Sequence, residues 1–424
     1  MKALVVDRRP IRFGAAMATS RIRPGSGAAV GVITLDDIDP PDLPSPDWVR
    51  LSPRMSGICG SDLATVDGRS SRWFEPIVSF PFVPGHEVVA DDPEGRRVIL
   101  EPVLGCVARG IDPPCPPCAN GNAGNCERLA HGHVDAGLQT GFCCDTGGGW
   151  STEMVAHPSQ LHEVPDDMSD TAAVMVEPTA CAIHAVLRAQ IQPDERVAVI
   201  GAGTLGLLSL AAIDHFSPAR ELFIGARYEQ QRRLATGLST HSGLVGVVDP
   251  ERLARRIRSS TGTTVIEHDH LDSSGWSTGS RLGGGADVTL DCVGSAESIA
   301  TALSITRPRG RIILVGMPGV ETIDMTPLWQ REIALIGAYT YGNETVNGSV
   351  TRTFDLAMDL VQRADLGRLV SATYALDRYT EALAHAGSAG RRGAVKIAFA
   401  NLDPDNGPAP RLTPRSTPRK GKRR

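Results

Sequence analysis

The chain is poor in aromatic residues, in long hydrophobic runs and in net charge of either sign. Aromatic residues make up 4% of the sequence, so a large stacking pocket for substrate is not expected. The longest apolar stretch, residues 197–213, is short for a membrane span and holds three glycines, which favours a buried strand and helix. A net charge of −5 argues against a nucleic-acid partner. No targeting segment is recognisable, so we expect a cytoplasmic protein without a membrane partner.

Cysteine is used in clusters rather than evenly along the chain. A cytoplasm keeps thiols reduced, so the nine cysteines indicate metal binding or catalysis more than disulfides. With 424 residues, of which 41% are hydrophobic and 21% charged, the chain is long enough for two soluble domains.

Two kinds of patterning divide the chain. Residues 1–165 alternate short β-rich runs with turns rich in Pro, Gly and Asp, which predicts a compact, largely β domain. From about residue 171 to 338, strand and helix patterns alternate, which predicts a parallel, doubly wound sheet. A helix near 351–362 and a strand near 394–399 are expected to rejoin the first domain. The C-terminal residues, with seven basic side chains and no acid over 411–424, are expected to be disordered.

The central motif is a glycine-rich turn between a buried strand and an apolar helix. Gly201, Gly203 and Gly206, with Thr204 and Leu205 inside the turn, match the G-x-G-x-x-G pattern of a dinucleotide site. The first glycine permits the turn, the second lets the backbone approach a pyrophosphate, and the third lets helix and strand pack closely. A plain glycine-rich turn is the alternative, but a second strand pattern at 221–225 supplies the βαβ context.

Three separated segments offer ligands for a catalytic zinc. Cys59 lies in a turn with Ser61 and Asp62, His86 stands beside Glu87, and Glu177 precedes a proline within an apolar helical stretch. A catalytic zinc takes three protein ligands and leaves a fourth position open. Each Cys or His alone could be a buried core residue, but an unpaired carboxylate in an apolar helix would be costly.

A second cluster consists of four cysteines in a Gly/Pro-rich loop, namely Cys106, Cys115, Cys118 and Cys126. Four thiolates are the ligand set of a closed structural zinc site. A pair of disulfides is the alternative, which the expected compartment disfavours.

These motifs occur in an order that resembles the zinc-containing medium-chain dehydrogenases/reductases, over residues 1 to about 399. The resemblance is to the branch with a glutamate ligand, which includes polyol, threonine and sugar dehydrogenases. It implies an α/β protein with a GroES-like β domain (1–178 with 339–400), a Rossmann domain (179–338) and a tail at 401–424. It also implies Cys59, His86 and Glu177 as zinc ligands, Glu87 as a replacement ligand, Ser61 as proton relay, Asp62 as an orienting residue, and a homo-oligomer.

The sequence departs from the family pattern in several places. Eight residues separate Cys106 from Cys115 where two are usual, which makes Cys106 the weakest candidate of the four. Ala64 stands where a proton-conducting histidine is frequent. Cys181 and His184 share a helical face with Glu177. We interpret Cys181 as a small core residue and His184 as a residue that either packs in the core or supports a metal ligand. No metal role is assigned to Cys143, Cys144 or Cys292.

The end of the second Rossmann strand predicts the cofactor. An NAD site needs an acid there to hold the ribose 2′-hydroxyl, but the chain has Ala226, Arg227 and Tyr228, with no acid before Glu229. A small residue followed by arginine accepts a 2′-phosphate. We therefore expect NADP rather than NAD, with Arg232 and Arg233 as helix-surface charges.

The predicted activity is hydride transfer between NADP(H) and a secondary alcohol, polyol or sugar. A zinc-free quinone or enone reductase is disfavoured by the two ligand clusters. The other alternative is a non-catalytic regulatory protein of the same fold, whose basic tail would engage an anionic partner.

Overall fold

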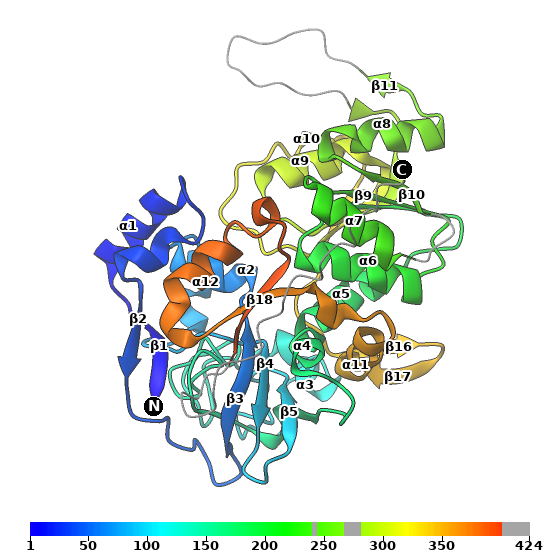
Figure 1. Cartoon of the computed structure of the whole chain (residues 1–424). Coiled ribbons are helices and arrows are strands. Elements are labelled where there is room, and N and C mark those ends of the chain that lie inside the picture. The colour runs from blue at the N-terminus through cyan, green and yellow to red at the C-terminus, as the bar shows by residue number, and fades with distance from the viewer. Residues whose placement is uncertain (240–243, 267–280, 401–424) are drawn as a thin grey trace, which may run out of the picture.

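The computed structural model describes residues 1–239, 244–266 and 281–400. Two large sheets organise this part of the chain, as Figure 1 shows. Strands β3, β4 and β5 lie in the lower half of the view, β9 and β10 lie in the upper right, and helix α5 lies between the two groups. The predicted tail, 401–424, lies outside the described residues.

The first sheet mixes early and late parts of the chain. Its seven strands are β18 (Val370–Tyr374), β19 (Lys396–Ala400), β3 (Val49–Gly57), β4 (Val88–Asp91), β5 (Arg97–Leu100), β7 (Leu161–Glu163) and β6 (Met154–Ala156), the last of which pairs with β3. Strand β3 alternates exposed and buried residues along its first half, as expected of an antiparallel sheet with one wet face. The predicted return of the chain end to this sheet is seen in the antiparallel pairing of β19 with β3.

The second sheet has six parallel strands in the order β10-β9-β8-β13-β14-β15. This is the Rossmann strand order. The strands are β10 (Leu244–Val248), β9 (Glu221–Gly225), β8 (Arg196–Ile200), β13 (Ala286–Asp291), β14 (Thr306–Leu314) and β15 (Ala334–Gly337). The crossover helices are α6 (Thr204–Phe216), α7 (Glu229–Leu238), α8 (Pro250–Thr261) and α9 (Ala296–Ile305), with a short α10 (Thr326–Gln330).

Helix α6 is apolar around most of its circumference because it is covered on both sides. Its residues 206–213 are all buried, between the Rossmann sheet and helix α5 (Val176–Arg188), and one apolar cluster joins these elements to α11 (Thr353–Arg363). A helix that is apolar all round is a buried helix. None of the helices in the described residues combines the length and apolar character needed to cross a membrane.

The stretch 171–190 is helical, in two parts, α4 (Asp170–Ala173) and α5. The helices are separate because Pro178 has no N–H to continue a helix from residue 174 and is tolerated only in a first turn. The first segment also contains helices that the pattern did not single out, namely α1 (Pro10–Ser20), α2 (Gly60–Val66) and α3 (Pro116–Ala119). Late in the chain, α12 (Tyr379–Ala386) packs against β18 and β19.

Small paired strands complete the fold. They are β1 (Lys2–Val6) with β2 (Ile33–Asp37), β11 (Val265–Ile266) with β12 (Arg281–Leu282), and β16 (Asn343–Val346) with β17 (Ser349–Arg352). The predicted domain limits stay a prediction, and the limit at residue 178 falls within the first turn of α5.

Candidate functional site

The structure brings Cys59, His86 and Glu87 together, as the first of two metal-ligand clusters among the described residues. One ligand atom from each lies within 4.8 Å of the others. Cys59 is the N-cap residue of α2. His86 and Glu87 follow Gly85, whose φ of +96° is a conformation that glycine adopts without strain. A turn and a helix end therefore aim these side chains at one point.

Asp62 links the first two ligands. One of its oxygens accepts a hydrogen bond from the Cys59 backbone N–H at 2.9 Å, and the other lies 3.4 Å from Nδ1 of His86. Burial disfavours the imidazolium, but the Asp62 carboxylate outweighs it and raises the pKa of His86 well above its ordinary value. A carboxylate on one ring nitrogen orients the other toward a metal, so Nε2 is the atom we assign to ligation.

Glu87 is held by a buried cation that sequence reasoning missed. Lys396, on β19, is 2% exposed and forms an ion pair with Glu87 Oε2, while its Nζ also donates to the Ile58 carbonyl at 3.3 Å. Glycine at position 57 leaves room for this ion pair, because a Cβ there would lie 1.8 Å from the same Glu87 oxygen. Lys396 belongs to no recognisable sequence motif. Its position beside Glu87 follows only from the pairing of β19 with β3.

Glu177 lies beside this cluster but outside its 4.8 Å group. Its Oε1 accepts a hydrogen bond from the Tyr341 hydroxyl at 3.0 Å. Burial raises the pKa of Glu177 to about 7, against the lowering influence of His86. Tyr341, buried after β15, is a second residue that the sequence did not single out.

The neighbouring polar residues of α5 have partners of their own. His184 Nδ1 lies 2.6 Å from Glu344 Oε1 on β16, and Cys181 Sγ lies 3.8 Å from Glu177 Oε1. Burial and the Glu177 charge raise the pKa of Cys181 well above its usual range, which keeps the thiol neutral. Both contacts agree with the interpretation of these residues as packing residues.

Ser61 and the glycine-rich turn lie at the starts of two helices, α2 and α6. Ser61 is partly exposed in the first turn of α2, two residues after Cys59. Gly201 has φ +88°, and a Cβ on Gly206 would lie 1.8 Å from the Gly201 carbonyl oxygen. A Cβ on Gly203 would meet nothing within 4 Å, so the turn at the start of α6 is open to a ligand. These are the three demands that a pyrophosphate site makes on its glycines.

The end of β9 presents a small buried residue and then an exposed cation. Ala226 is fully buried and Arg227 is exposed, while Tyr228 precedes α7. Arg232 donates to the carbonyls of Ala226 and Arg227 at 2.8 and 2.9 Å. None of the three residues that follow β9, Ala226, Arg227 and Tyr228, carries a carboxylate.

The second metal-ligand cluster comprises Cys106, Cys115, Cys118 and Cys126, whose sulfur atoms all lie within 4.8 Å of one another. All nine cysteines of the chain are free, and the sulfur atoms of Cys106 and Cys126 lie 3.7 Å apart, far beyond the length of a disulfide bond. Each sulfur accepts one backbone N–H, at 3.3 to 3.5 Å. Four such acceptors fit thiolates around one zinc.

The long connection between the first two of these cysteines is fixed by Arg109. This arginine is fully buried, and its guanidinium donates to five carbonyls, those of Leu104, His131, Val134, Asp135 and Gly137. One of the inserted residues is thus tied through its side chain to carbonyls outside the insertion, and Cys106 lies in the cluster despite the unusual spacing.

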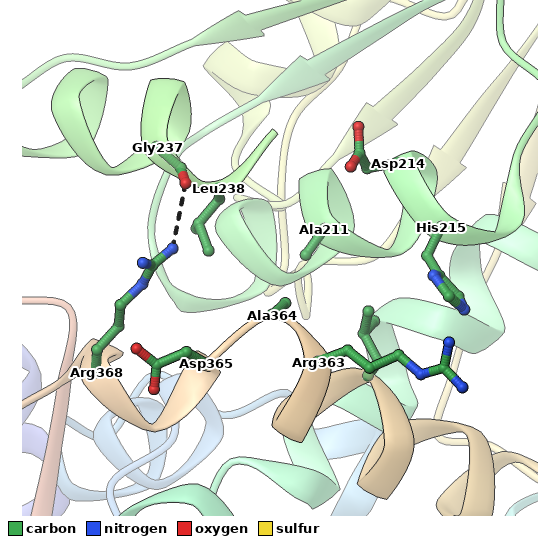
Figure 2. A pocket seen from close by; sticks show the side chains of 10 residues that line it. Ala211, Asp214, His215, Gly237, Leu238, Arg363, Ala364, Asp365 and Arg368 are labelled. Atoms are coloured by element: carbon green, nitrogen blue, oxygen red, sulfur yellow. Dashed lines mark hydrogen bonds between the residues drawn. The ribbon is translucent and has the colours of Figure 1, made fainter. Parts of the chain in front are cut away.

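A separate pocket of about 360 Å³ lies between α6, α7 and the segment that follows α11. Figure 2 shows Arg368 pointing to the Gly237 carbonyl, which it reaches at 3.3 Å. None of the ten lining residues is a predicted site residue, so this pocket is not the site built above.

Comparison with known proteins agrees with this geometry. Residues 45–166 match the alcohol dehydrogenase GroES-like domain, and residues 233–362 match the zinc-binding dehydrogenase family. Sorbitol dehydrogenase of Arabidopsis thaliana is 30% identical over 331 residues, which is 74% of this chain and 80% of that protein. L-Idonate 5-dehydrogenase of Vitis vinifera is 28% identical over 386 residues, 87% and 93% of the two chains.

A solved structure supports the fold. Galactitol-1-phosphate dehydrogenase of Escherichia coli superposes with a TM-score of 0.65 at 18% identity, covering 94% of this chain and 100% of that chain. Together with the sequence relatives, this confirms the predicted α/β architecture of a GroES-like domain and a Rossmann domain. The chain belongs to the zinc-containing medium-chain dehydrogenases.

Proposed function

We propose that the protein is a zinc-dependent dehydrogenase that transfers hydride between NADP(H) and a polyol, a sugar or another secondary alcohol. The observation that carries the proposal is the convergence of Cys59, His86 and Glu87 ligand atoms within 4.8 Å. Sorbitol and L-idonate dehydrogenases among the relatives support a polyhydroxylated substrate.

The residues present fit a bound zinc. Glu87 Oε1 is buried and has no hydrogen-bond partner among the described residues, as expected of an atom that awaits a cation. When bound, zinc would supply a Lewis acid that stabilises negative charge on the substrate oxygen. We assign Cys59 and His86 as ligands. Glu87 is assigned as the third ligand because its carboxylate lies in the same 4.8 Å group, and Glu177 is the alternative third ligand.

The other groups have supporting roles in this proposal. Ser61, two residues after Cys59, would take the hydroxyl proton, and Asp62 would keep His86 oriented. Tyr341 holds the Glu177 carboxylate in place. The turn of Gly201, Gly203, Thr204, Leu205 and Gly206 would bind the pyrophosphate at the start of α6, and Ala226, Arg227 and Tyr228 the adenosine end of NADP. The four-cysteine cluster would hold a second zinc that stabilises its loop.

Turnover is the test. We expect oxidation of at least one polyol or sugar in a panel, with kcat/KM for NADP above that for NAD. Turnover with NAD alone would contradict the cofactor assignment, and zinc-loaded, folded protein without any turnover would favour the regulatory alternative. The expected homo-oligomer, for which β15 offers an exposed sheet edge, is tested by light scattering.

A further inference from the structure

The segment just before β19 runs along the cofactor-binding edge of the Rossmann sheet. At one end, the Val395 carbonyl lies 3.5 Å from the Thr204 hydroxyl, in the first turn of α6. At the other, the backbone at Gly390 touches Tyr228, because a Cβ there would lie 2.6 Å from the tyrosine ring. Residues 390–395 therefore follow the path that the sequence predicts for the dinucleotide, from pyrophosphate to adenosine.

Two exposed arginines occupy the middle of this segment. Arg391 and Arg392 belong to the turn η7 (Gly390–Arg392), which begins at the contact with Tyr228. Neither forms an ion pair with a carboxylate in the described part of the chain. Burial and the nearby Arg392 charge lower the pKa of His385, which agrees with a guanidinium that no acid neutralises.

The other arginines near Tyr228 are already engaged. Arg233 pairs with Glu229, and Arg232 is bound to the Ala226 and Arg227 carbonyls. Arg227, like the arginines of η7, is exposed and has no ion pair within the described ranges. Three uncompensated guanidinium groups from distant parts of the sequence thus lie on segments that meet at Tyr228.

We propose that Arg391 and Arg392 are the second half of a 2′-phosphate site, facing Arg227 across Tyr228. The ligand class is a ribose phosphomonoester, a dianion that arginine binds through charge-assisted, bidentate hydrogen bonds. The inference rests on the proposed use of NADP. It adds that the segment before β19, as well as the Rossmann domain, binds the 2′-phosphate. A phosphate held from both sides would draw the two parts of the molecule together.

Equilibrium binding tests this without turnover. The double variant Arg391→Ala/Arg392→Ala is compared with the wild type and with Arg363→Ala, an exposed arginine on α11. The probes are NADP, NAD, adenosine 2′,5′-bisphosphate and AMP, with Kd measured by calorimetry. We expect the Kd of both 2′-phosphorylated probes to rise at least about tenfold in the double variant, with NAD and AMP within about twofold. The control should match the wild type for all four probes.

The outcomes separate this inference from the proposed function. If the wild type binds NADP no better than NAD, the cofactor preference and this inference both fail. If Arg227→Ala removes the preference for NADP while the double variant keeps it, this inference alone is overturned, and the η7 arginines are ordinary solvated charges. Equal weakening of NADP and NAD would also overturn it, because the contact would then not be with the 2′-phosphate.

Discussion

The two ligand clusters differ in how the chain treats their charge. In the four-cysteine cluster every sulfur accepts a backbone N–H, and the ligands are of one kind. In the cluster of Cys59, His86 and Glu87 the ligands differ, and buried oxygens are left without hydrogen bonds. A cation, Lys396, is buried beside the cluster of Cys59, His86 and Glu87.

In the proposed function, this difference separates a structural metal site from a reactive one. A saturated thiolate cage has no position left for a substrate, as in closed structural zinc sites. The mixed set instead has buried carboxylate oxygens without hydrogen bonds and one lysine paired with Glu87. On this proposal, backbone donors surround the structural site and side-chain charges surround the site where chemistry is expected.

The largest predicted effect comes from the reactive cluster. Replacement His86→Ala should lower kcat/KM by about a thousandfold or more, because several kcal/mol of charge stabilisation depend on the metal. The variant should stay folded, although the loss of a buried side chain beside the buried Asp62 carboxylate should lower the Tm. The matched control is His157→Ala, a histidine outside both clusters, which should keep full activity. A loss of less than tenfold in His86→Ala would contradict the assignment.

The opposite split is expected for the cysteine cluster. Cys118→Ser should lower the Tm by at least about 5 °C, because the metal site contributes to folding. The surviving folded protein should keep most of its kcat. Cys144→Ser, another half-buried cysteine, serves as control and should leave the Tm nearly unchanged. An unaltered Tm in Cys118→Ser would remove the structural role.

Substitution of Lys396 tests whether its positive charge stabilises the buried Glu87 carboxylate. Lys396→Met leaves Glu87 buried without its cation and should cost about 3 kcal/mol in the free energy of unfolding, measured with denaturant. Lys396→Arg should cost less, and Glu87→Gln in the Met background should recover part of the loss. A cost below about 1 kcal/mol for Lys396→Met would show that the pair does not matter for stability.

The smallest effect should follow from the outer hydrogen bond to Glu177. Tyr341→Phe removes the donor from a buried carboxylate, which costs about 1–3 kcal/mol, and should lower kcat about tenfold. Tyr374→Phe loses a comparable bond, to His385 at 2.9 Å, and should lower stability without changing kcat. Equal kcat in the two variants would reduce Tyr341 to a packing residue.

The sequence predicted the parts of this molecule that are coded locally. The glycine turn, each strand or helix pattern and each ligand motif are formed by residues close together in the sequence. Their spacing in the sequence therefore predicts their local geometry. Cys106 shows the limit of that reasoning. Its unusual spacing weakened the prediction, yet its sulfur lies in the four-cysteine cluster, and the inserted Arg109 is buried and bound to carbonyls outside the insertion.

Residues brought in by long-range pairing could not be predicted. Lys396 and Tyr341 reach the site only through the return of the chain end, more than 150 residues after the ligands that they contact. The exposed helix α1 was also missed, since its weakly patterned sequence resembles a loop. Which glutamate serves the metal depends on such distant partners and not on the motif.

Zinc stoichiometry tests the central claim most directly. Elemental analysis of purified, folded protein that has not met a chelator should give two zincs per chain for the wild type. His86→Ala and Cys118→Ser should each retain one, and only the former should lose its activity. One zinc or none in the wild type, or loss of both zincs from either variant with its fold intact, would contradict two independent metal sites.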